Sequence, residues 1–368
     1  MAKKDRLGSL DIFRGLTVAF MIIVNSPGSW NYVYAPLRHA KWHGCTPTDL
    51  VFPFFLFIVG VSMWFSMKKY GHELNTDSFL RILRRTASIF ALGLLLAVFP
   101  YFGRDYSTFR IMGVLQRIAL AYGIGALICM TIRRDYLWIV TTVILLSYWG
   151  LLSFSGGPEP YSLEGNFALK VDLALLGKNH LYTGFGIPFD PEGLLSTLPS
   201  ICTIIIGYYA GELVSKGSTG GKAVIKLIVI GAALTGLGLL WNEFFPINKP
   251  LWTSSYVLYT SGIAMATLAL IYLISDVFKF QKWGGFFRVF GTNALFSYFL
   301  AGIWIKILLS VKLPSGDAGI TLYSWFYEKI CVPVAGNMTG SLLFAIIQMI
   351  IIWSVALILF RKKVMIRL

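Results

Sequence analysis

The chain has 368 residues, of which 56% are hydrophobic and only 13% are charged, and its mean hydropathy is +0.70. Soluble domains carry about 25% charged residues, so this composition excludes an ordinary soluble protein and indicates a polytopic membrane protein. The net charge of +15 does not indicate nucleic-acid binding, because lysine and arginine mark the cytoplasmic loops of membrane proteins. No Cys/His spacing is typical of a zinc site, and we expect no metal.

Apolar windows long enough to span a bilayer recur along the whole chain. A spanning helix needs about 20 mostly apolar residues, and about ten such windows occur, at 10–27, 49–68, 82–100, 112–131, 135–154, 192–213, 223–242, 253–275, 286–311 and 341–360. Two polar stretches, 155–191 and 312–340, lie between them. The pattern predicts an all-α polytopic membrane protein, with about ten transmembrane helices in one domain over residues 1–368.

Basic residues predict the orientation of these helices. They flank alternate loops and both chain ends: Lys3, Lys4, Arg6, Lys68, Lys69, Arg81, Arg84, Arg85, Arg133, Arg134, Lys216, Lys222, Lys226, Lys279, Lys282, Arg288, Arg361, Lys362, Lys363 and Arg367. Such alternation places both termini in the cytoplasm. The loop after the first window then lies outside, together with 155–191 and 312–340.

That first outer loop is the most informative segment. It contains His39 and His43 and ends in Asp49, directly before a long apolar run. A carboxylate at membrane depth costs about 2.5–3.5 kcal/mol at a helix centre and usually faces a cavity with a partner. An imidazole can take up and return a proton near neutral pH, and Asp49 could orient it. Equally, His39 can be a solvated loop residue and Asp49 a helix N-cap; both interpretations stay open.

Two further candidates lie in the first window. Asn25 ends it just before Pro27, where a carboxamide can donate to a developing oxyanion or satisfy a broken helix end. Asp11 and Arg14 are three residues apart and share a helix face. Arg14 therefore either pairs with Asp11 or binds a phosphate.

Later windows contribute single polar residues. Arg117 lies in the outer part of the fourth window, where an arginine faces a polar interior or snorkels to the surface. Lys249 and Trp252 precede the eighth window; Lys249 could contact a phosphate or sugar, and Trp252 could stack on a sugar or belong to the interfacial aromatic belt. Asn293, inside the ninth window, can simply tie helices together. The outer residues Arg104, Asp105 and Arg110 are either an anion site or solvated.

Four cysteines are present. Cys129 and Cys202 lie in apolar segments and are expected to be buried. Cys45 and Cys331 fall in outer loops, and a disulfide between them is open in an oxidising compartment.

Several of these motifs resemble the heparan-α-glucosaminide N-acetyltransferase family of transmembrane acetyltransferases. The most specific is His39-Ala40-Lys41-Trp42 followed by Asp49-Leu50-Val51-Phe52-Pro53. The others are Leu10-Asp11-Ile12-Phe13-Arg14-Gly15, Val24-Asn25, Gly113-Val114-Leu115-Gln116-Arg117, Asn248-Lys249-Pro250-Leu251-Trp252-Thr253 and Gly291-Thr292-Asn293. The chain lacks the large N-terminal lumenal region of the lysosomal members. We therefore expect a short bacterial-type member in the cell inner membrane, with the His39 loop facing the periplasm.

The resemblance implies that His39 is the catalytic histidine, with Asn25 and Asp49 beside it. It implies acetyl-CoA as donor and a terminal glucosamine of a heparan-like saccharide as acceptor. We assign acetyl-CoA contacts to Arg14, Arg117 and Lys249, and acceptor contacts to Trp42, Trp252 and Asn293. Expected partners are membrane lipid and an amino-sugar or glycan acceptor; a homodimer is left open, and no nucleic acid is expected. The alternatives are a sugar transporter or permease and an O-acyltransferase of a cell-envelope glycan.

Overall fold

The computed structural model describes residues 7–100, 106–216, 220–314 and 319–366. Six of the charged residues discussed above, Lys3, Lys4, Arg6, Arg104, Asp105 and Arg367, lie outside this part of the chain.

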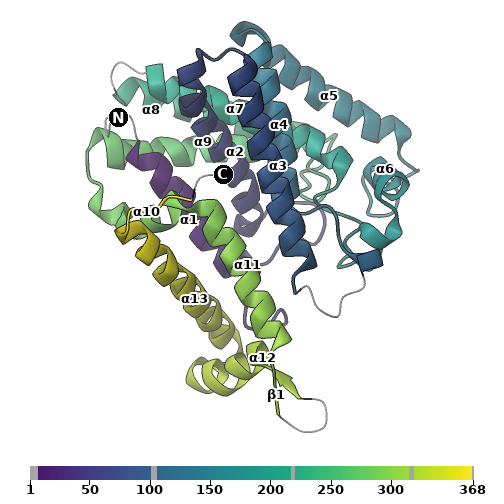
Figure 1. The fold of residues 1–368 in the computed structure, drawn as a ribbon. Helices are drawn as coiled ribbons and strands as arrows, with labels where there is room; N and C mark the ends of the chain where they lie inside the picture. The colour runs from purple at the N-terminus through teal and green to yellow at the C-terminus, as the bar shows by residue number, and fades with distance from the viewer. Residues whose placement is uncertain (1–6, 101–105, 217–219, 315–318, 367–368) are drawn as a thin grey trace.

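Helices dominate the fold (Figure 1). They are α1 (Gly8–Asn25), α2 (Val51–Met67), α3 (Thr76–Val98), α4 (Val114–Thr131), α5 (Leu137–Ser155), α6 (Phe167–Leu176), α7 (Leu194–Lys216), α8 (Gly220–Trp241), α9 (Ser254–Tyr272), α10 (Gly285–Thr292), α11 (Ala294–Ser310), α12 (Leu322–Phe326) and α13 (Val332–Arg361). Two short strands, β1 (Lys312–Leu313) and β2 (Ile320–Thr321), pair antiparallel. Helices satisfy every backbone polar group internally, which lipid requires. The predicted all-α membrane fold is confirmed.

Within the described residues, eight helices are long and apolar enough to cross a membrane, and the bent pair α10–α11 would be a ninth. The remaining predicted window is α3. It is helical, but it carries Asp77, Arg81, Arg84 and Arg85 and does not belong to that group. The polar stretch 155–191 contains α6, and 312–340 contains the strands, α12 and the first turns of α13.

The expectation of one continuous helix over 286–311 is wrong. The segment breaks at Asn293, and the helices on either side are bent by 70°. Asn293 has a non-helical backbone (φ −132°, ψ 46°). Its side-chain amide donates to the Val364 carbonyl (3.0 Å) and its oxygen accepts from the Ile366 amide (2.9 Å). Asn293 thus binds the chain beyond α13 at the point where the helix breaks.

Helices α2 and α7 make a close contact that positions the site. A Cβ atom on Gly60 would lie 2.0 Å from the Ile204 carbonyl oxygen, and one on Gly207 would lie 2.1 Å from the Phe57 carbonyl oxygen. Small residues allow such backbone contact between membrane helices. A Cβ atom on Gly211 would lie 2.8 Å from the Val61 carbonyl oxygen. Gly207 thus lies against Phe57, and four residues further along both helices Gly211 lies against Val61, so α2 and α7 run in the same direction. The residues that precede the two helices therefore lie at the same end of the bundle.

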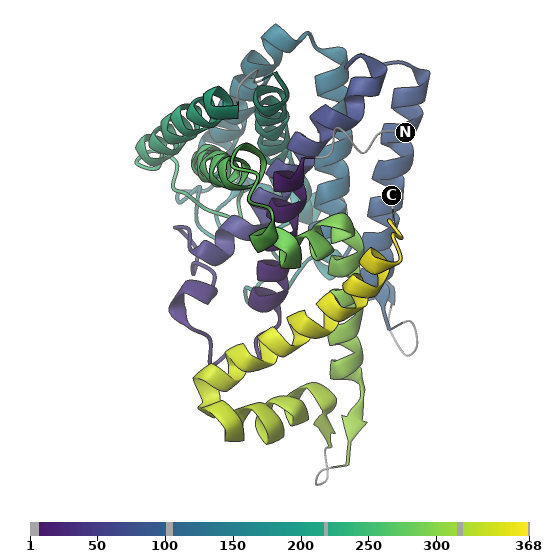
Figure 2. The same ribbon diagram turned by 90° about the vertical axis from the view of Figure 1, so that its left-hand side faces the viewer.

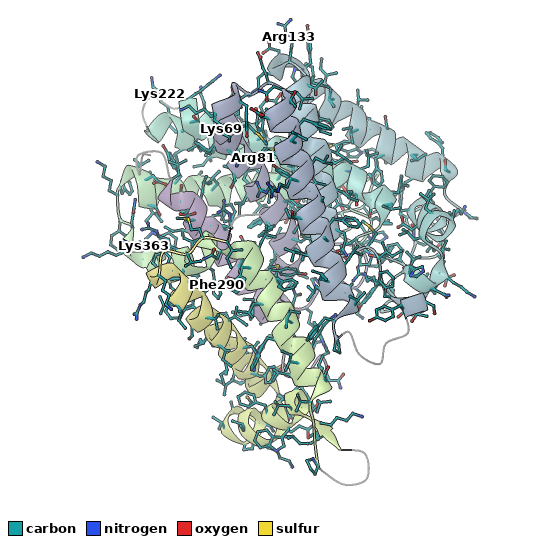
Figure 3. All side chains as sticks on the ribbon, viewed as in Figure 1. Lys69, Arg81, Arg133, Lys222, Phe290 and Lys363 are labelled. Carbon is teal, nitrogen blue, oxygen red and sulfur yellow. The ribbon has the colours of Figure 1, made fainter. Side chains whose placement is uncertain are left out.

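The two ends of the molecule differ in charge. Figure 3 shows Lys69, Arg81, Arg133 and Lys222 in the upper part of the view, away from α12, and Lys363 near mid-height. Figures 1 and 2 place α12 and the first turns of α13 at the opposite end, from which α13 runs back along the bundle. Four of the basic residues that sequence analysis assigned to one side, Lys69, Arg81, Arg133 and Lys222, thus share one end of the fold.

Candidate functional site

The polar loop after α1 folds back onto the start of α2. Asp49 lies in a 3₁₀ turn, Pro47–Leu50, and its Oδ2 accepts hydrogen bonds from the Thr46 amide (3.0 Å), the Thr46 hydroxyl (3.0 Å) and the Ala40 amide (2.9 Å). Its Oδ1 lies 2.6 Å from His39 Nδ1. The two interpretations of Asp49 are therefore compatible, because one oxygen caps the turn and the other binds the imidazole.

Lys249 approaches the same pair from the loop between α8 and α9. Its Nζ lies 3.2 Å from His39 Nδ1 and 3.5 Å from Asp49 Oδ1. The loop is held by the side chain of Asn248, which donates to the Trp42 carbonyl (2.9 Å). Burial lowers the pKa of the Lys249 ammonium, although the charges of Asp49 and Glu192 oppose this shift.

A cavity of about 490 Å³ opens beside these groups. Its volume is in the usual range of small-molecule sites, roughly 300–1,000 Å³. Five of the predicted site residues line it: Asn25, His39, Asp49, Lys249 and Trp252. The wall also includes the charged residues Arg110, Glu192 and Lys306. The cavity therefore brings together an imidazole, a carboxamide and charges of both signs.

An ion cluster forms the wall near the start of α7. Arg110 donates to Asp190 from both Nε (2.8 Å, to Oδ2) and Nη2 (2.6 Å, to Oδ1), and Nη2 also binds Glu192 Oε2. Burial alone would lower the pKa of Arg110, but Glu192 and Asp190 outweigh it and raise that pKa above its ordinary value. The guanidinium is therefore charged, and two carboxylates share it.

Comparison with known proteins identifies the family. The family described as "Heparan-alpha-glucosaminide N-acetyltransferase, catalytic" matches residues 6–238. This chain belongs to that N-acetyltransferase family. Heparan-alpha-glucosaminide N-acetyltransferase of Mus musculus is 29% identical over 350 residues, which are 80% of this chain and 53% of the relative. The protein of that name from Homo sapiens is 28% identical over 353 residues, 81% of this chain and 53% of the relative. The chain thus spans about half the length of these relatives.

Two arginines assigned to acetyl-CoA lie outside the cavity wall of this N-acetyltransferase-family chain. Arg117 is fully buried; it donates to the Ser196 hydroxyl and the Gly193 carbonyl, and its guanidinium lies 5.0 Å from the centre of the Trp252 ring. Of the two positions that the sequence left open for Arg117, the structure shows the interior one. Arg14 lies 3.6 Å from Asp11 and donates to Ser62 and to the Gly291 carbonyl. The geometry favours supporting roles for both arginines.

Two residues assigned to the acceptor also lie elsewhere. Trp42 donates to the Tyr161 carbonyl (2.8 Å) and packs edge-on against Phe185 and Phe189. Through these contacts Trp42 connects the His39 loop to the 155–191 segment. Asn293 binds the C-terminal segment, as described above. Trp252 does line the cavity.

Cys129 and Cys202 are buried, as expected, and the disulfide left open between Cys45 and Cys331 is not formed. All four cysteines, each within the described part of the chain, are free thiols, Cys45 and Cys331 included. Burial, helped by the negative charge of Asp49, raises the pKa of Cys45 to about 12, so its thiol stays protonated.

Sequence reasoning missed two charged residues of the wall, Glu192 and Lys306, and left the role of a third, Arg110, open. Glu192 stands two residues before α7, the same pattern as Asp49 before α2, and that repetition was a usable signal. Arg110 is not simply solvated, because it binds two carboxylates. Lys306 lies in an apolar helix, and a charge at such a position is itself a sign of a polar interior. Its ammonium donates to three carbonyls at the end of α3, those of Leu96, Ala97 and Phe99.

Proposed function

We propose that this protein is a transmembrane N-acetyltransferase that moves an acetyl group from acetyl-CoA to the amino group of a glucosamine-containing, heparan-like saccharide. Membership of the N-acetyltransferase family supports acyl transfer. The observation that carries the proposal is the 2.6 Å contact between His39 Nδ1 and Asp49 Oδ1 at the wall of the cavity.

This contact gives His39 the arrangement of a general base. With its Nδ1–H donated to Asp49, the unprotonated Nε2 is left for the cavity, and in the described structure Nε2 has no hydrogen-bond partner. An amine attacks a thioester only when neutral, so Nε2 first removes the ammonium proton and releases it to solvent. The unprotonated Nε2 then takes the second amine proton as the C–N bond forms. The C–S bond then breaks, and the proton passes to the leaving thiolate. Asp49 stabilises the imidazolium between these steps.

The other wall residues support this reaction. Asn25 is the last residue of α1, and its side chain makes no hydrogen bond within the described residues. Its carboxamide is free to donate to the oxyanion of the tetrahedral intermediate. Lys249 sits beside Asp49 and holds the acetyl donor or the sugar. Trp252 is only 1% exposed and has the Arg117 guanidinium over its ring, so it shapes the wall and does not stack on the sugar. Removing one oxyanion donor typically costs about 10²–10³ in kcat.

The proposed orientation puts the cavity at the periplasmic face of an inner membrane. Helices α2, α4, α7 and α9 begin at the cavity end, and four of the basic residues of Figure 3 lie towards the other. Since basic loops are cytoplasmic, acetyl groups from a cytoplasmic acetyl-CoA pool are transferred to an acceptor on the far side.

The test compares His39→Ala with His43→Ala in purified protein. His43 lies in the same loop but is not part of the described cavity wall. We expect His39→Ala to lower the rate of glucosamine acetylation by about 10²–10⁴, the usual worth of a general base, and His43→Ala to leave it within about threefold. Activity of His39→Ala within about tenfold of wild type contradicts the proposal. Uptake of glucosamine into proteoliposomes without acetyl-CoA would instead favour a transporter.

A further inference from the structure

Glu192 presents a carboxylate oxygen to the cavity that the described protein does not use. Arg110 binds Asp190 through two N–H groups but reaches Glu192 only through the shared Nη2, to Oε2. Oε1 of Glu192 has no hydrogen-bond partner among the described residues, and the side chain is 11% exposed while lining the cavity. A buried carboxylate that accepts so few hydrogen bonds is costly unless something else binds it.

The other acid of the wall is already saturated. Both oxygens of Asp49 accept hydrogen bonds, from His39 on one side and from Thr46 and Ala40 on the other. An incoming donor therefore finds a vacant acceptor on Glu192 and not on Asp49.

The cations that face Glu192 are engaged elsewhere. Arg110 is shared with Asp190, and Lys249 lies against Asp49. The Nη2 of Arg117 is taken by Ser196 and the Gly193 carbonyl, and its guanidinium packs on a tryptophan ring. The Lys306 ammonium is turned to the end of α3. These groups hold Glu192 ionised without occupying Oε1.

We propose that Glu192 binds the ammonium group of the acceptor and selects amino sugars over sugars that carry a hydroxyl at that position. This inference rests on the proposed function. An ammonium has three N–H donors and no acceptor. Moving this charge from water into a partly buried cavity costs free energy unless a carboxylate there pairs with it. A hydroxyl gains less, because charge-assisted hydrogen bonds are about twice as strong as neutral ones.

The fold sets Glu192 and His39 at one end of a rigid pair of helices. Asp49, which binds His39, immediately precedes α2, and Glu192 precedes the parallel helix α7. The acceptor amine can therefore be held by Glu192 while His39 removes its proton. Glu192 acts mainly on binding and His39 mainly on turnover.

The experiment compares Glu192→Gln with Asp190→Asn. Gln keeps the size and one acceptor but loses the charge, and Asp190 binds the same Arg110 without being part of the described cavity wall. Binding of glucosamine and of glucose is measured in the His39→Ala background, so that no turnover is needed. We expect Glu192→Gln to cut the preference for glucosamine about tenfold, and Asp190→Asn to change it less than threefold. In otherwise wild-type enzyme, Glu192→Gln should raise KM for glucosamine and leave kcat within about threefold.

Two outcomes overturn the inference: a preference that survives in Glu192→Gln, or one lost equally in Asp190→Asn, which would mean that Arg110 is responsible. If Glu192→Gln does not fold, the pH dependence of sugar binding by the His39→Ala protein tests the inference instead. Its preference for glucosamine must fall as pH rises and the sugar ammonium loses its proton, and a preference independent of pH refutes the assignment. Failure of wild-type protein to acetylate glucosamine at all would refute the proposed function instead.

Discussion

Replacing Asp49 by Asn separates its two structural roles. Oδ2 of Asp49 receives three donors, from Ala40 and Thr46, whereas Oδ1 receives His39 Nδ1 and lies 3.5 Å from the Lys249 ammonium. An Asn side chain has one acceptor oxygen, which must take the Oδ2 position to satisfy those three donors. Its NH₂ group then faces His39 and donates to Nδ1. The imidazole is forced to carry its proton on Nε2, where it cannot act as a base.

The structure allows both effects of Asp49→Asn to be estimated. Loss of the base predicts a fall in kcat of about 10²–10⁴. Asn caps a helix about as well as Asp, so the stability cost is confined to the contacts that Oδ1 makes with His39 and with the Lys249 ammonium. A hydrogen bond to a charged group is worth about 1.5–3 kcal/mol, and the His39 side chain is 42% exposed, which reduces this to about 1 kcal/mol. That corresponds to a drop in Tm of about 2–4 °C.

The assay measures CoA thiol release with glucosamine as acceptor, and Tm by intrinsic fluorescence. A double variant, His39→Ala with Asp49→Asn, tests whether Asp49 works through His39. If it does, adding Asp49→Asn to His39→Ala lowers kcat by less than threefold, because residues that act as a unit are not additive. The reasoning is refuted if the two effects multiply, or if Asp49→Asn alone retains kcat within about threefold.

Two further predictions concern topology and pH. A single cysteine at Glu164, in a cysteine-free background, should react with a membrane-impermeant maleimide in intact spheroplasts, since 155–191 is expected outside; reaction only after lysis would invert the topology. Burial raises the pKa of Asp172 to about 6, against about 4 in an unfolded chain. Between these two pH values the folded state binds more protons than the unfolded state. The free energy of unfolding therefore falls as pH rises from about 4 to 6, by up to about 3 kcal/mol. Asp172→Asn should flatten that pH dependence of Tm, whereas an unchanged slope would assign it to other groups.

Local patterns were enough to predict the helices and the centre of the site. Apolar windows predict spans because lipid permits little else, and each window does contain a helix. The pairing of His39 with Asp49 was also within reach of sequence, because the two residues are ten positions apart and Thr46 and Asp49 close the turn between them through a capping box.

The directions of side chains and the bend between α10 and α11 could not be predicted from local sequence patterns. A hydropathy profile does not reveal a bend in a helix. The break at Asn293 involves a hydrogen bond to Val364, 71 residues away. Likewise, apolar periodicity does not say that Arg117 packs behind Trp252, or that Trp42 reaches Tyr161 and not the cavity. Such side-chain directions follow from tertiary packing alone.

Glu192 shows how far an acidic residue placed just before an apolar helix can be interpreted from the sequence alone. Asp49 and Glu192 each stand just before a long apolar helix, and an acid at that point is favoured by the helix dipole whether or not it has a function. The close packing of the parallel helices α2 and α7 through Gly60 and Gly207 brings both acids to one cavity. A glycine-mediated contact deep in the membrane thus fixes the distance between the group that holds the proton acceptor and the group proposed to hold the amine. Substitutions at Gly60 should therefore disturb the cavity without touching it, as a change in KM and kcat together.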